Sequence, residues 1–189
     1  IPVVEKHLQL HSVVQKLVAE TSVASIPVIL RFLLTLSRVR EGAMMLVNAG
    51  FFASLRGLLA KLSDDQHSSV ICGERSLSYE YDRSEKAKHI WGLSLAVVTA
   101  IVHFLGDASS STGIVDYVMA HLLVEKAFLI SYYLSVPDFP SEDHDKKRAR
   151  SLNRHTTLST LKETEQTLML ICVLARYRNS WNKAMKEMD

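Results

Sequence analysis

The segment that most constrains the fold is residues 90–105, IWGLSLAVVTAIVHFL, which is apolar except for Gly92, Ser94, Thr99 and His103. As a helix this segment would be roughly 24 Å long at 1.5 Å per residue. That length is short of the ~30 Å hydrocarbon core of a bilayer, so we expect no transmembrane segment. A helix that is apolar on nearly every side must be surrounded by protein. We therefore predict that this segment is the central buried helix of an all-α domain.

Helical periodicity elsewhere in the chain predicts roughly eight helices and no sheet. The 189 residues are 48% hydrophobic and contain only 7 Gly and 4 Pro, so long uninterrupted helices are expected. Polar, Ser-rich residues 63–83 and charged residues 136–154 lack this periodicity and are predicted to be loops. The chain begins without Met and ends at KAMKEMD, and we expect residues 1–189 to form one segment of a longer protein.

Residues 40–62, REGAMMLVNAGFFASLRGLLAKL, carry the most informative local pattern. A short helix should end near Asn48, and Gly50 is suited to a left-handed turn before a second helix begins at Phe51. This order is typical of a junction in armadillo or HEAT repeats, which stack on their neighbours to cover their apolar sides. The pattern predicts an α-solenoid built from such repeats.

Few residues indicate catalysis or metal binding, and we assign no catalytic, cofactor-binding or metal-binding residue. His7 and His11 are one helical turn apart, but no HExxH motif or nearby third ligand accompanies them. His103 and Cys172 lie in apolar segments and are interpreted as core residues. Glycine spacing fits neither GxGxxG nor GxxxxGK, so no phosphate-binding loop is expected. We therefore predict that the protein is not an enzyme and binds no small-molecule substrate.

Two groups of residues are candidate contacts for a partner. The first is a basic run formed by Lys146, Lys147, Arg148 and Arg150. Acidic residues precede this run directly, and the formal charge of the whole chain is only +2, so no direct nucleic-acid binding is expected. The second group is Trp181 and Met185, which share one side of a final helix over residues 180–188. We expect that apolar side to lack a partner within these residues.

Three stretches resemble a known family: HIWGLSLAVVTAIVHFLGD, EKAFLISYYLSVPDFPSEDHDKKRARS and LKETEQTLMLICVLARYRNSWNKAMKEMD. They are similar to the carboxy-terminal part of plant nucleoporins of the one-eighty-eight class, which are large α-solenoid scaffold proteins of the nuclear pore inner ring. The resemblance covers most of the chain from about Lys86 onward. It implies a non-enzymatic scaffold at the nuclear envelope, in contact with other inner-ring nucleoporins and with transport receptors as further candidate partners.

Two alternatives remain open at this point. The first keeps the fold but makes the protein a cytosolic armadillo or HEAT-type adaptor that binds peptides or cargo proteins. Such adaptors carry asparagine at a repeat period, whereas Asn48, Asn153, Asn179 and Asn182 do not recur regularly. The second alternative is an enzyme or a metal-dependent regulator that uses His7 and His11.

Overall fold

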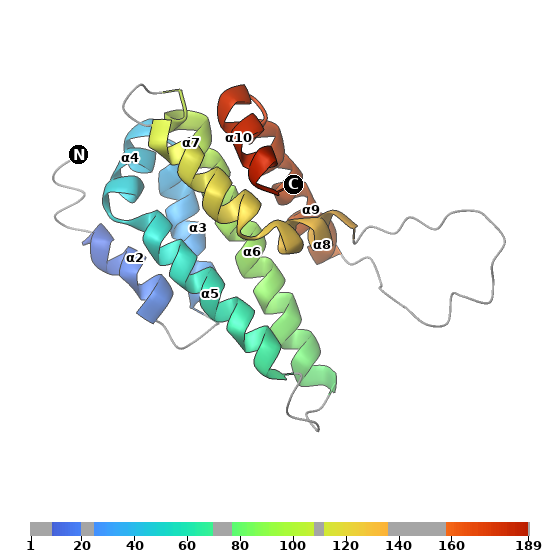
Figure 1. Cartoon of the computed structure of the whole chain (residues 1–189). Helices are drawn as coiled ribbons and strands as arrows, with labels where there is room; N and C mark the ends of the chain where they lie inside the picture. The colour runs from blue at the N-terminus through green and yellow to red at the C-terminus, as the bar shows by residue number, and fades with distance from the viewer. Residues whose placement is uncertain (1–8, 20–24, 70–76, 108–111, 136–157, 189) are drawn as a thin grey trace.

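A computed structural model describes residues 9–19, 25–69, 77–107, 112–135 and 158–188 (Figure 1). Within these ranges the elements are helical and no strand is present, which confirms the all-α prediction for this part of the chain. In chain order they are α2 (Leu10–Ala19), α3 (Ile26–Ser37), α4 (Arg40–Asn48), α5 (Phe51–Ser69), α6 (Leu77–Leu105), α7 (Thr112–Val118), the π-helix η1 (Met119–Val124), α8 (Ala127–Ser135), α9 (Leu158–Leu174) and α10 (Arg178–Met188).

Helix α6 is the centre of the fold, as the apolar segment predicts. It packs most extensively against α9 and α3, and it also contacts α4, α5 and α7. Six apolar side chains in its second half have no exposed surface: Ile90, Leu95, Val97, Val98, Ile101 and Val102. The helix ends at Leu105, immediately before Gly106.

The principal helices form two rows, between which the chain alternates. The α6 row consists of α3, α6 and α9, with α6 in the middle. The α5 row consists of α2, α5, the continuous α7–η1 helix and α10, which follow one another from lower left to upper right in Figure 1. The short helix α4 follows α3 and contacts α3 and α6, whereas the short helix α8 follows η1 and contacts η1 and α9. The described core lies between the two rows.

The predicted turn between α4 and α5 is confirmed. Gly50 has a φ of +81°, in the left-handed region that favours glycine. The two helices meet at an angle of 68°. This bend places Met45 and Leu46 of α4 and Phe51 and Leu55 of α5 in the common core.

The predicted loop over residues 63–83 is wrong for most of its length. Helix α5 continues to Ser69, and α6 begins at Leu77, so both ends of the predicted loop are helical. The segment contains no Pro and only one Gly, and Ser and Asp each cost less than about 1 kcal/mol in a helix. A segment without apolar periodicity therefore has no side suited to burial, but it can still form a helix. The second predicted loop, 136–154, lies outside the described residues.

The helix that follows α6 contains a widened turn. The helix that begins at Thr112 widens into the π-helix η1 before a turn at Glu125 and Lys126 starts α8. The Glu125 N–H donates to the Ala120 carbonyl over 3.0 Å, which is the i→i−5 hydrogen bond of a π-helix. Apolar spacing gave no signal for this widened turn.

By length and composition alone, residues Lys86–Leu105 could cross a membrane, and 61% of that window is buried inside the structure. The bent pair α4–α5, over Arg40–Asn48 and Phe51–Leu62, would count as a second such span. A mostly buried core helix of a soluble protein meets the same criterion. Length and composition therefore do not separate a membrane span from the core helix in this chain.

Candidate interaction surfaces

The apolar side of α10 packs against other helices of the same chain, so the prediction that it lacks a partner is wrong. Trp181 and Met185 are half-buried and pack against the core, and Ala184 between them is buried. Their neighbour is η1. A tight turn after α9, in which the Tyr177 N–H donates to the Leu174 carbonyl over 3.0 Å, sends the chain back across the α5 row. The other candidate contacts, Lys146, Lys147, Arg148 and Arg150, lie outside the described residues.

The two ring nitrogens of His11 are both used in hydrogen bonds. Its Nδ1–H donates to the carbonyl of Ala49 over 3.1 Å, and its Nε2 accepts from the side-chain amide of Gln15 over 2.7 Å. The first bond joins α2 to the turn between α4 and α5, and the second lies within α2. His7 lies outside the described residues. Within the described part of the chain, no group of three or more His, Cys, Asp or Glu side chains is arranged to hold a metal ion.

His103 and Cys172 are exposed, so their interpretation as core residues is wrong. His103 lies on the same side of α6 as the partly exposed Ala96 and Ala100, where this row faces away from the α5 row. Cys172 lies on the side of α9 opposite its buried residues. Neighbouring helices bury an apolar helix only on the sides where they pack against it. His103 and Cys172 lie on other sides of α6 and α9.

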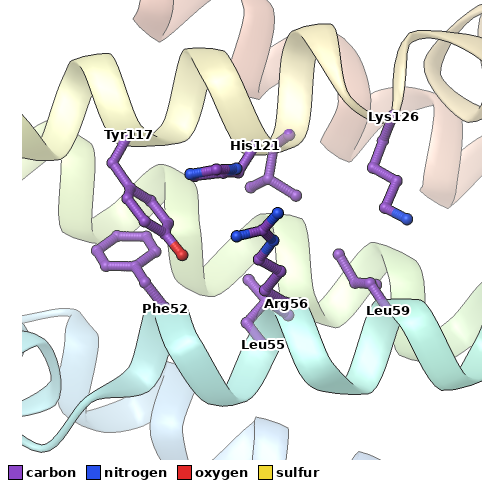
Figure 2. Close-up of a pocket in the computed structure, with 8 residues that line it drawn as sticks. Phe52, Leu55, Arg56, Leu59, Tyr117, His121 and Lys126 are labelled. Atoms are coloured by element: carbon purple, nitrogen blue, oxygen red, sulfur yellow. The ribbon is translucent and has the colours of Figure 1, made fainter.

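A line of aromatic and charged side chains joins α5 to the α7–η1 helix (Figure 2). The Phe52 ring of α5 lies 5.5 Å from the Tyr117 ring of α7, and the Tyr117 ring lies 4.3 Å from the His121 ring of η1, measured between centroids. His121 Nδ1 contacts Glu125 Oε2 at 2.9 Å, and Arg56 of α5 reaches the same oxygen at 3.3 Å. We call these five residues the α5–η1 contact.

The hydrogen bond from His121 makes the largest contribution to lowering the pKa of Glu125. Burial opposes it, and the charges of Arg56, Lys126 and His121 lower the pKa further. A small hollow beside this contact is lined by both helices (Figure 2). Its lining holds Arg56, His121 and Lys126 but no nucleophile paired with a base. The α5–η1 contact therefore has the features of a packing contact between two helices.

A second polar cluster crosses the α6 row. Arg31 of α3 donates through Nη2 to Nε2 of His89 on α6 over 3.1 Å. Partial burial lowers the pKa of His89, and the charges of Arg31 and of Lys162 on α9 lower it further. Three successive helices thus bring two cations to either side of a neutral imidazole. We call this cluster the basic row.

The sequence analysis missed the basic row because its members are far apart in the chain. Arg31, His89 and Lys162 come from three helices, and none belongs to a local motif. Only the packing order of α3, α6 and α9 brings them together.

Comparison of the chain with known proteins yields no match to a family model, to a curated protein or to a solved structure.

Proposed function

We propose that this chain is a stretch of an α-solenoid that serves as a structural scaffold of the nuclear pore inner ring. The observation that carries the solenoid part of the proposal is the alternation of the chain between the α6 row and the α5 row. In a solenoid each repeat contacts mainly its neighbours, so equivalent helices line up side by side in two layers. The succession α3, α6, α9 on one side, and α2, α5, α7–η1, α10 on the other, supports the proposed repeat arrangement.

The far side of α9 supports the same proposal. Leu161, Leu168 and Cys172 lie at helical spacing on the side of α9 that points away from α6, and all three are exposed. Terminal repeats that end a solenoid require a polar outer side. These three apolar side chains, with the exposed Glu165 among them, suit the packing of a further helix of the same scaffold.

The nuclear pore part of the proposal rests on the resemblance of three sequence stretches to nucleoporins of the one-eighty-eight class. The protein would act without catalysis, through its shape and its contacts with other inner-ring nucleoporins. Transport receptors are further candidate partners, and the expected location is the nuclear envelope. No small-molecule substrate or direct nucleic-acid contact forms part of the proposal.

The experiment that tests this function is proximity labelling of the tagged protein in its own cells, with its position imaged in parallel. A signal at the nuclear rim with inner-ring nucleoporins enriched is the expected result. A diffuse cytosolic signal with soluble cargo enriched would overturn the scaffold proposal and favour the adaptor. A tagged soluble protein of similar size provides the background for both readouts.

A further inference from the structure

We propose that the basic row binds an acidic segment of a partner protein, with carboxylates of that segment between Arg31 and Lys162. The proposal depends on the packing of α3, α6 and α9 and not on a nuclear pore location. It commits to a protein segment as the occupant because of the charge and the apolar surroundings of the cluster.

The cluster brings positive charge to one surface of the α6 row. Partial burial lowers the pKa of His89, and the charges of Arg31 and Lys162 lower it further. Arg31 uses one of its N–H groups on this neutral acceptor over 3.1 Å. Within the described part of the chain, neither Arg31 nor Lys162 has an ion-pair partner. A carboxylate at this position would accept charge-assisted hydrogen bonds from these two cations.

Apolar side chains border the basic row on the same surface. Val28 is 66% exposed and Phe32 is 38% exposed, and both share a side of α3 with Arg31. Leu93 follows His89 by one turn of α6 and is partly exposed, and Met169 of α9 is 47% exposed. A peptide segment that carries both carboxylates and apolar side chains matches this mixture.

A nucleic acid matches this surface less well. Affinity for nucleic acid comes mainly from many phosphate contacts, which require a broad field of Lys and Arg. The net charge of the chain is only +2, and Glu165 lies farther round α9, one turn beyond Lys162. Within the described ranges Arg31 and Lys162 have no ion-pair partner, and the apolar side chains beside them therefore favour an acidic peptide.

The test is fluorescence anisotropy on the whole chain, with a fluorescein-labelled peptide of repeated Glu-Glu-Leu as the probe. Peptides of repeated Gln-Gln-Leu and Lys-Lys-Leu serve as neutral and basic controls. We expect binding of the acidic peptide only, weakening as salt is added because the contacts are exposed. Stronger binding of a single-stranded RNA than of the acidic peptide would overturn the proposal, as would no binding of the acidic peptide.

A matched pair of double variants locates the site. Arg31→Glu with Lys162→Glu reverses two charges of the basic row, and Arg178→Glu with Lys183→Glu makes the same change in charge at exposed positions of α10. We expect the first pair to weaken peptide binding by about tenfold or more and the second by less than about twofold. Equal losses would overturn the proposal, because net charge alone would then explain the binding.

Folding is checked by circular dichroism, and Arg31→Gln with Lys162→Gln replaces the first pair if the reversed charges impair it. A nuclear-rim location with no peptide binding would reject this inference alone. Peptide binding with a cytosolic location would reject the proposed scaffold role alone.

Discussion

The α6–α9 junction and the α5–η1 contact join helices in different ways. At the α6–α9 junction, Gly92 and Gly106 lie beside Glu163 and Tyr177 of the neighbouring segment, so the two backbones approach closely. Glu163 itself is only 2% exposed. The α5–η1 contact instead relies on an ion pair whose side chains are 52% exposed on Arg56 and 36% exposed on Glu125.

The two kinds of contact contribute differently to the free energy of folding in the two rows. Close packing in the α6 row removes apolar surface from water, which stabilises a fold by about 25 cal/mol per Å². An exposed ion pair contributes only about 0–1 kcal/mol and weakens as salt is added. Two buried threonines of the α6 row keep their hydrogen bonds, since Thr99 and Thr167 each donate to the carbonyl four residues earlier over 2.8 Å. The α6 row should therefore determine global stability, while the α5–η1 contact sets local geometry.

The largest expected effect comes from truncation of the buried side of α6. Leu95 and Ile101 have no exposed surface, so Leu95→Ala or Ile101→Ala should each lower the free energy of unfolding by about 2–5 kcal/mol. Phe128→Ala is the control, because that ring is 82% exposed on α8. Urea denaturation followed by circular dichroism measures all three. Unchanged midpoints for both α6 variants would contradict the central role of this row.

A smaller loss should follow from adding one methyl group at Gly106. A Cβ there would overlap the Tyr177 phenol and the Val102 carbonyl, so Tyr177 must move away from the position in which its hydroxyl donates to that carbonyl over 3.4 Å. We expect Gly106→Ala to cost about 1–3 kcal/mol.

Gly113→Ala is the matched control for that substitution. A Cβ at Gly113 meets nothing within 4 Å, and Gly113 lies in α7, where alanine is the better helix former by up to about 1 kcal/mol. The two variants should therefore shift the thermal midpoint in opposite directions. Equal shifts would mean that the α6–α9 junction is no tighter than the surface of α7.

These two junctions also show how far the sequence alone predicts the molecule. The apolar run at residues 90–105 identifies α6, and Gly50 identifies the turn before α5, because each signal is local. The meeting of Gly106 with Tyr177 depends on segments far apart in the chain, and no local pattern encodes it. For the same reason the basic row was missed, and Trp181 was assigned to an open surface although α10 folds back onto η1.

The smallest effect concerns Glu125 in the α5–η1 contact. Its pKa is lowered from 4.5, first by the hydrogen bond from His121 and then by the charge of Arg56, with burial opposing. As pH falls, the unfolded chain therefore takes up this proton before the folded chain does. The stabilisation is complete above pH 4.5 and is lost as pH falls through the folded pKa.

Glu125→Gln should remove this contribution, costing up to about 1 kcal/mol at neutral pH and less as pH falls below 4.5. Urea midpoints of wild type and variant, measured from neutral to acidic pH, should therefore converge as the solution becomes acidic. Glu187→Gln makes the same chemical change at an exposed position of α10 and should leave the wild-type pH profile unchanged. If the Glu125→Gln and Glu187→Gln profiles coincide, the ion pair contributes nothing measurable, and the aromatic rings of Phe52 and Tyr117 alone hold the contact.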